Sequence, residues 1–403
     1  MHLLIRHARI LTLAPPKEGV VTLPGGGKAR RGAALKELGV IARGDVLIRD
    51  GKIAAVGPEL AVPADAEVIE ADGRVLMPGF VDCHTHACWA GDRLADWEQE
   101  LAGVAPTEIL KKGGGIPATV RAVKEATRKQ LAAGLRTRLD LMLRGGTTTM
   151  EVKSGYGLTI EGETKMLHAI TRAAQEFAGT VVPTALLGQT VDGDVAAFTR
   201  TVVREVLPAV WHEFPGVTVD AVCGADAWPL EACVRLFERA GKHGLPLRVS
   251  ADSAGATGMI AEALRLHLRS VDHLENASKA DLLALAASDT VGVFTPAARI
   301  SAVCSGMSAG EIVSAGGLPD GMRTMSLPVF APPYSCAAAA SAVASSSVAP
   351  AFICSALTAS KIAPLTVPAP CTAPADASMP SRATAPACPT PGSMVAALSL
   401  IHI

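Results

Sequence analysis

Two histidines separated by one residue, His84 and His86, are the residues of this chain best suited to chemistry. Alternate residues of a strand point to the same face, so the two imidazoles can bind one divalent ion and leave positions open for water. A pair with this spacing also occurs on polar strand faces that bind nothing. Here Pro78-Gly79 and a short apolar run precede the pair, which favours a metal site at the end of a strand.

Two further segments carry side chains that could contact a substrate. Arg93 follows Gly91-Asp92, where a guanidinium could bind a carboxylate with two hydrogen bonds, although a solvated loop arginine has the same appearance. Tyr156, one of two tyrosines in the chain, lies in the glycine-flanked segment 151–158 and could donate a hydrogen bond or pack at the surface. The triple glycine at 113–115 could let backbone approach a ligand, but alone it is a weak signal.

The elements that must position these residues follow an alternating pattern from about residue 76. Short apolar runs at 75–77, 147–152, 181–187, 218–222, 247–250, 270–273 and 290–294 predict strands. Amphipathic stretches at 117–143, 162–177, 195–213, 230–243 and 256–268 predict helices between them. This alternation predicts an α/β fold with parallel strands, and about six units favour an incomplete (β/α)8 TIM-like barrel over an open sheet. In such barrels the chemistry lies at the C-terminal ends of the strands.

Residues 1–75 predict a small N-terminal β domain. Apolar runs flank Asp50-Gly51, which is a strong signal for a hairpin. Proline and glycine clusters in 14–44 predict a looped insertion without regular elements. The predicted domains are therefore the β domain at 1–75, the barrel at 76–296 and a tail at 297–403.

The tail differs in composition from the rest of the chain. Of the 75 charged residues only six lie after position 300, and the segment is rich in Ala, Ser and Pro. One interpretation is a disordered tail. The other is a non-native segment, in which the chain leaves its proper reading frame near residues 296–300. Low charge and five cysteines in this segment favour the second interpretation.

The bulk composition excludes several function classes. A net charge of −1 argues against a nucleic-acid partner or an anionic membrane surface. The N-terminal segment is interrupted by charged residues and predicts a strand rather than a signal peptide, and no apolar run predicts a membrane span. Nine cysteines at scattered spacings, without a CxxC pair, argue against a zinc ribbon and a secreted disulfide framework. A cytoplasmic location is the simplest expectation.

The order HTH, GDR, GGGI and EVKSGYGL, read from residue 84 to residue 158, resembles the imidazolonepropionase family of metal-dependent amidohydrolases. The resemblance extends patchily from about residue 45 to about residue 296. It implies a (β/α)8 barrel beside a small β domain, usually in a homodimer. It also implies a small-molecule substrate, 4-imidazolone-5-propanoate, which is hydrolysed to N-formimidoyl-L-glutamate in histidine degradation.

The resemblance also implies roles for individual residues. His84 and His86 match the first two ligands of one divalent ion, either Zn or Fe. Arg93 and Tyr156 match substrate-binding residues. His273 matches the catalytic barrel-end histidine that assists the attack, although a core histidine is the alternative at that position. In this mechanism a metal-bound water attacks the ring amide and Arg93 orients the propanoate.

The chain departs from the family pattern at four places. Ser250 stands where the family has a third metal-binding histidine, and a hydroxyl is a poorer ligand than imidazole. Ser253 and Thr190 stand where the family has substrate-contacting residues. The family also has a metal-binding aspartate on the last barrel strand, and nothing after residue 296 matches it; Asp320 is a candidate by residue type alone. Two alternatives therefore stay open: another cyclic amidohydrolase or deaminase on the same barrel, and an inactive remnant that lacks two metal ligands.

Overall fold

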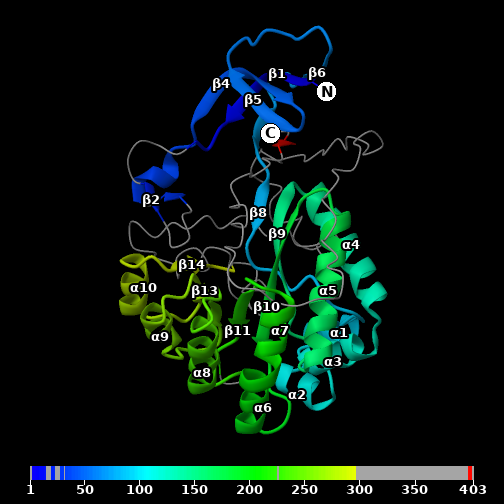
Figure 1. The fold of residues 1–403 in the computed structure, drawn as a ribbon, viewed down its shortest axis with the longest axis vertical. Coiled ribbons are helices and arrows are strands. Elements are labelled where there is room, and N and C mark those ends of the chain that lie inside the picture. The colour runs from blue at the N-terminus through cyan, green and yellow to red at the C-terminus, as the bar shows by residue number, and fades with distance from the viewer. Residues whose placement is uncertain are drawn as a thin grey trace, which may run out of the picture.

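The computed structural model describes residues 2–14, 20–22, 28–30, 32–224, 227–295 and 398–401. Figure 1 shows a small sheet around the N-terminus at one end and a larger α/β body at the other. A separate cluster of buried hydrophobic residues fills each part, so each has its own core.

The small sheet contains the strands expected before residue 76. In the order β15-β7-β1-β4-β5, with β6 beside β1, it is made of β1 (His2–Leu11), β4 (Val40–Arg49), β5 (Lys52–Gly57), β6 (Ala66–Glu70), β7 (Val75–Pro78) and β15 (Leu398–Ile401). Arg49 pairs with Lys52 across the β4–β5 hairpin, and Asp50 and Gly51 have φ of 50° and 75°. Two successive left-handed residues are what a type I′ turn requires, so the hairpin prediction is confirmed.

The insertion predicted to lack regular elements is only partly irregular. β2 (Val20–Thr22) and β3 (Lys28–Arg30) pair as antiparallel strands, and the 3-10 helix η1 (Gly32–Lys36) follows them. The prediction was wrong for these segments, because short pairings form between the glycine and proline clusters. The clusters themselves, at 15–16 and 25–27, lie outside the described residues.

The α/β body is built on parallel strands in sequence order. They are β8 (Phe80–Asp82), β9 (Thr147–Lys153), β10 (Thr180–Gly188), β11 (Thr218–Ala221), β12 (Arg248–Ala251), β13 (Ser270–His273) and β14 (Val291–Val293). β8 to β11 form one sheet and β12 to β14 another, and parallel bridges from Val219 to Leu247 and from Val222 to Ser250 join them. The result is a curled parallel sheet, as the sequence predicts for an incomplete barrel.

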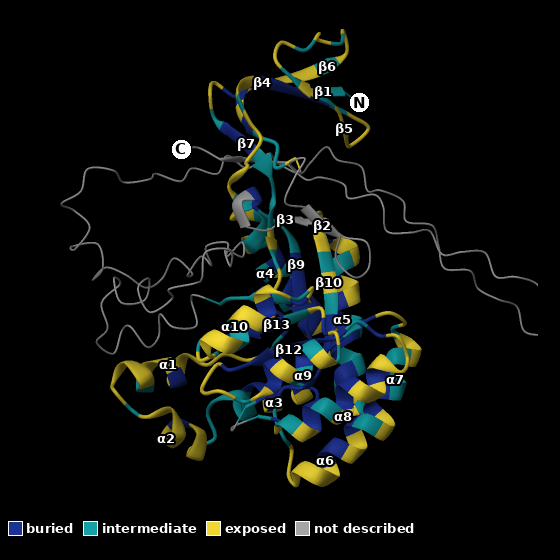
Figure 2. Ribbon diagram, turned by 90° about the vertical axis from the view of Figure 1, so that its left-hand side faces the viewer, coloured by how far each residue is buried: buried dark blue, intermediate teal, exposed yellow. Residues whose placement is uncertain are grey.

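Helices cover the outside of this sheet (Figure 1). They are α1 (Leu94–Leu101), α2 (Pro106–Lys111), α3 (Ile116–Glu125), α4 (Arg128–Arg144), α5 (Ile160–Glu176), α6 (Val195–Thr201), the π-helical turn η2 (Val202–Val206), α7 (Leu207–Glu213), α8 (Leu230–Gly241), α9 (Met259–Arg265) and α10 (Lys279–Ala286). Figure 2 shows buried and exposed residues alternating along helices such as α8, which buries Leu236 and Phe237 and exposes Arg235. No helix in the described part of the chain is long and apolar enough to cross a membrane.

Two sequence expectations need correction. The strand expected at 75–77 exists, but it pairs with β1 and belongs to the small sheet, because Leu76 is fully buried in that sheet's own core. The helix expected at 117–143 is two helices, because α3 ends at Glu125 and Thr127 begins α4 through a reciprocal capping box with Gln130.

The predicted tail is described only at Leu398–Ile401, whose backbone forms β15 antiparallel to β7. The remainder of that prediction lies outside the described residues.

Candidate functional site

The segment with His84 and His86 follows directly after β8, so it lies at the C-terminal end of the first strand of the curled sheet. The residue between the histidines, Thr85, bonds this segment to the neighbouring strand β9. Its N–H donates to Oε2 of Glu151 over 2.9 Å, its hydroxyl donates to the Glu151 carbonyl over 2.6 Å, and its own carbonyl accepts from the N–H of Lys153 over 3.1 Å. The middle position of the motif is therefore structural.

The two imidazoles lie close together, with ring centroids 5.4 Å apart. Burial and the nearby cation Lys153 hold the pKa of His86 well below its usual range, so its ring is neutral. Its Nδ1 atom is buried and has no hydrogen-bond partner among the described residues. A neutral imidazole with a free lone pair is the form that binds a metal ion.

His273, at the end of β13, joins this pair with its ring centroid 5.1 Å from that of His84 and nearly perpendicular to it. Its Nδ1 lies 3.0 Å from the hydroxyl of Thr295 and 3.3 Å from a carboxylate oxygen of Glu275. His273 and Leu274 have φ of 80° and 71°, in the left-handed region that non-glycine residues rarely adopt. Backbone strain of this kind concentrates at functional sites.

Tyr156 lies next to His86, with its ring centroid 6.1 Å from that of His86. Burial raises the pKa of Tyr156 to about 12, and the charge of Arg93 acts in the opposite direction, so Tyr156 keeps its proton. Its loop is held by the buried Glu163 of α5, which accepts hydrogen bonds from the N–H groups of Gly155, Gly157 and Leu158 at 2.9–3.0 Å.

Arg93 lies at the N-terminus of α1 and is bound by its own helix. Its Nε donates to Oδ2 of Asp96 over 2.9 Å, and the same oxygen accepts the N–H of Gly115 over 2.7 Å. A Cβ on Gly114 would come within 2.4 Å of Oδ1 of Asp96, so the triple-glycine segment packs directly against the residue that holds Arg93. The segment that carries Arg93 and the triple glycine at 113–115 are therefore packed together through Asp96.

A buried network of charges lies beneath the histidines. Lys153 contacts Glu151 over 3.1 Å and forms a shorter ion pair with Asp220, while Arg248 is ion-paired with Asp272 and lies 3.3 Å from Glu151. Burial alone would lower the pKa of Lys153, but Asp220 and Glu151 outweigh it and the pKa is raised. Burial alone would raise the pKa of Asp272, but Arg248 and His84 outweigh it and the pKa is lowered. Lys153 and Asp272 are therefore charged.

Sequence reasoning did not single out this network, although a signal was present. Lys153, Asp220, Arg248 and Asp272 are charged residues within or next to segments predicted to be apolar strands. A charge in a buried strand must be paired, so four such charges on neighbouring strands predict a network at the sheet interior.

The residues that depart from the family pattern are also at this end of the sheet. Ser250 is buried in β12, while Ser253 is exposed and its carbonyl accepts a hydrogen bond from the side chain of Asn276 over 2.7 Å. The carbonyl of Thr190 accepts from the indole N–H of Trp228 over 3.1 Å. Asp320 lies outside the described residues.

The donor set fits half of a metal site. His86 is neutral with an unpartnered buried nitrogen, and His84 lies beside it. In the part of the chain that the structure describes, however, no group of three or more His, Cys, Asp or Glu side chains is arranged to hold an ion. Ser250 stands where the family pattern has a third histidine. The imidazoles of His84 and His86 are therefore the two donors that would hold an ion.

Comparison with known proteins identifies relatives of this chain. The amidohydrolase family model matches residues 75–326. The imidazolonepropionase of Deinococcus deserti is 40% identical over 267 residues, which cover 66% of each chain. That of Deinococcus radiodurans is 39% identical over 287 residues, which cover 71% of this chain and 69% of the relative. The chain thus spans about two thirds of the length of the relatives that it matches.

Solved structures agree in fold. A 5-methylcytosine deaminase from Klebsiella pneumoniae has a TM-score of 0.52 at 16% identity, over 74% of this chain and 67% of that one. The guanine deaminase of E. coli has a TM-score of 0.50 at 14% identity, over 78% of this chain and 72% of that one. Both likenesses concern the fold alone.

Proposed function

This chain belongs to the amidohydrolase family, and from that premise we propose that its site hydrolyses the ring amide of 4-imidazolone-5-propanoate to N-formimidoyl-L-glutamate, a step of histidine degradation. The observation that supports this most is a chain of neighbouring rings: the centroid of His84 lies 5.1 Å from that of His273 and 5.4 Å from that of His86, and the centroid of His86 lies 6.1 Å from that of Tyr156. These residues come from three segments spread over 190 positions, and they meet at the C-terminal ends of parallel strands, where barrel enzymes carry their chemistry.

The proposed roles follow from the surroundings of each side chain. His84 and His86 would hold one divalent ion, Zn or Fe, which lowers the pKa of water and polarises a carbonyl when bound. With its Nδ1 engaged by Thr295 and Glu275, His273 has Nε2 left to exchange a proton with the reacting groups. Tyr156, protonated at neutral pH, would donate a hydrogen bond to the substrate.

Arg93 would bind the propanoate carboxylate. Its Nε is occupied by Asp96, which leaves the two terminal nitrogens of the guanidinium for an anion. The charge of Arg93 lowers the pKa of Tyr156 against the effect of burial, which supports the proposal that the two side chains bind the tail and the ring of one small substrate.

The test is an assay of the full chain, loaded in turn with Zn²⁺ and with Fe²⁺, that follows the loss of 4-imidazolone-5-propanoate and the formation of N-formimidoyl-L-glutamate. We expect formation of this product, and its loss in the His84→Ala and His273→Ala variants. The matched control is His212→Ala, which removes the imidazole of an exposed histidine on α7 and should leave the rate unchanged.

Two other outcomes would replace the proposal. Turnover of cytosine or guanine rings, but not of the imidazolone, would assign the chain to a deaminase on the same barrel. Absence of turnover with every substrate and both metals, in folded protein, would make it an inactive remnant, and Ser250 is the residue that favours this outcome.

We also propose the division of the chain at 1–75, 76–296 and 297–403, a cytoplasmic location and a homodimer. Two separate cores support a first boundary in this region, but Leu76 packs in the core of the small sheet, so the boundary moves past β7. Free thiols at Cys83, Cys88, Cys223 and Cys233 accord with a reducing compartment. Sedimentation of the full chain tests the dimer.

A further inference from the structure

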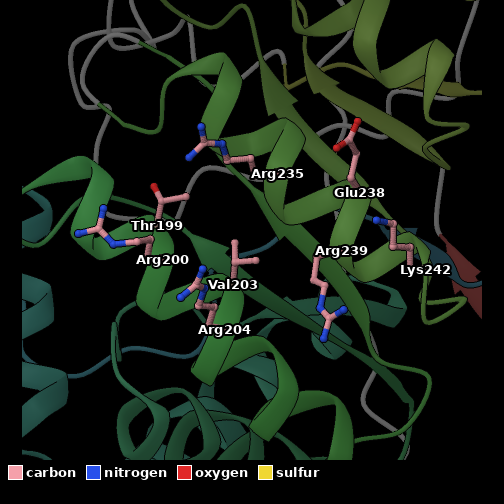
Figure 3. Close-up of a pocket in the computed structure, with 8 residues that line it drawn as sticks. All are labelled: Thr199, Arg200, Val203, Arg204, Arg235, Glu238, Arg239 and Lys242. Carbon is pink, nitrogen blue, oxygen red and sulfur yellow. The ribbon is translucent and has the colours of Figure 1, made fainter.

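A basic pocket lies in the helical layer, away from the histidines. It has a volume of about 270 Å³ and lies between the α6–η2 segment and α8 (Figure 3). Its charged lining consists of Arg200, Arg204, Arg235, Arg239, Lys242 and Glu238. We call this set the basic pocket. It shares no residue with the candidate active site.

The spacing of the cations brings like charges together on each helix. Arg200 and Arg204 are four residues apart, as are Arg235 and Arg239, and Lys242 follows three residues later. Such pairs lie on one face of a helix, and like charges at this spacing destabilise it. Two such pairs facing one pocket raise the repulsion further, so the arrangement costs stability in the absence of an anion.

The cations of the basic pocket differ from other arginines in the part of the chain that the structure describes. Within the described residues, none of the five cations forms an ion pair, whereas arginines elsewhere do: the half-buried Arg136 with Asp140 and the exposed Arg172 with Glu176. The one acidic residue of the pocket, Glu238, accepts from Arg265 over 3.1 Å. The cations therefore keep their hydrogen-bond donors available for a ligand.

We propose that the basic pocket binds a compact anion with two linked phosphoryl groups, a diphosphate. Five cations match the three to four negative charges of a diphosphate. Four of the five are arginines, whose planar donor forks match phosphate oxygens with two hydrogen bonds each. The volume lies just below the range of about 300–1,000 Å³ that drug-sized ligands occupy, so the diphosphate itself, rather than a large attached group, is what the pocket recognises.

Titration calorimetry of the full chain with inorganic pyrophosphate at low ionic strength tests this proposal. The Arg204→Gln/Arg239→Gln variant keeps much of the apolar stem of each side chain and removes one cation from each wall of the pocket. We expect it to bind pyrophosphate at least ten-fold more weakly than the wild-type chain. Its thermal midpoint without ligand should be equal or higher, because a repulsion has been removed.

The control variant is Arg172→Gln, which removes an exposed arginine of α5 outside the pocket and should bind pyrophosphate as the wild type does. Pyrophosphate also chelates divalent ions, but both variants keep the same active site, so chelation cannot separate them. ADP binding as tightly as pyrophosphate would support recognition of the diphosphate group. Equal binding by the double variant and the wild type, or citrate binding as tightly as pyrophosphate, would overturn the proposal.

Discussion

Nδ1 of His84 lies 2.6 Å from Oδ2 of Asp272, so a hydrogen bond joins the segment after β8 to β13. Arg248 and the other partners of Asp272 outweigh its burial and keep its pKa below the usual range, so this carboxylate is ionised and can only accept. The hydrogen bond therefore uses a proton on Nδ1 of His84, and in the neutral form of the ring Nε2 is the lone-pair nitrogen. A carboxylate that fixes the tautomer of a histidine in this way orients it for binding a metal ion.

Replacing Asp272 by Asn should therefore lower both stability and metal affinity. The substitution removes a buried negative charge that faces Arg248 and Lys153, and breaking such a buried network costs about 3–5 kcal/mol. Zn²⁺ affinity should fall about 10–100-fold, because His84 loses its orienting partner. Urea unfolding and a Zn²⁺ competition titration measure the two effects.

Asp192→Asn is the matched control for this variant. Asp192 forms an exposed ion pair with Lys124 at 3.5 Å, and its loss should change the free energy of unfolding by less than about 1 kcal/mol. If Asp272→Asn behaves like Asp192→Asn in both measurements, the network does not position His84.

Glu163→Gln should loosen the loop that carries Tyr156. Three backbone N–H groups donate to the two carboxylate oxygens of Glu163, whereas an amide has one oxygen and places an NH₂ against one of those donors. We expect a loss of about 1–3 kcal/mol in the free energy of unfolding and a higher KM, as Tyr156 becomes less well placed. The exposed Glu161 on the same helix provides the control, since Glu161→Gln should alter neither quantity.

The same residue predicts a pH dependence with a definite sign. Burial raises the pKa of Glu163 above the ordinary value of 4.5, although its hydrogen bonds act in the other direction. Folding then favours the protonated form, so the contribution of Glu163 to the free energy of unfolding is full below pH 4.5 and declines as the pH rises through the folded-state pKa. Unfolding measured from pH 4 to 8 should show this decline in the wild type and not in Glu163→Gln. A decline of equal size in the variant would assign it to other groups.

How much of this arrangement the sequence predicts depends on the range of the interactions. The Asp50-Gly51 hairpin and the strand that ends at His273 follow from local patterns, and both were predicted. The strand before His84 was predicted at 75–77, but β8 (Phe80–Asp82) has this place. The bond from His84 to Asp272 spans 188 positions. The N–H of Gly115 supports Asp96, the partner of Arg93, and this bond depends on a loop packing against a helix start. No local periodicity encodes such contacts, which is why the motifs could be recognised but not the residues that hold them.

Gly114→Ala should weaken substrate binding without touching the substrate. The new Cβ would lie 2.4 Å from Oδ1 of Asp96 and 2.6 Å from a methyl carbon of Ile109, so Asp96 must move and Arg93 with it. We expect KM to rise several-fold while kcat changes little, because Arg93 serves binding rather than proton transfer. Gly57→Ala, whose Cβ would meet Leu60 at an ordinary 3.7 Å, is the control. A fall in kcat with KM unchanged would argue against this role of Arg93.

Ser250→His should restore a third imidazole to the site. Ser250 lies in β12, and its strand is bridged to Val222 and paired with β13, the strand that ends at His273. A third neutral nitrogen donor should tighten Zn²⁺ binding at least ten-fold and raise the hydrolysis rate with it, because metal occupancy limits the rate when two ligands are missing.

The larger side chain at a buried position should cost about 1–3 kcal/mol of stability, which unfolding by urea will register. Ser253→His, at an exposed position three residues further on, adds the same group outside the strand and should leave Zn²⁺ affinity unchanged. The comparison is made on dialysed protein by competition with a chromophoric chelator. If folded Ser250→His binds Zn²⁺ no more tightly than the wild type, β12 does not face the ion that His84 and His86 are proposed to hold, and the half-site must be completed from elsewhere in the chain.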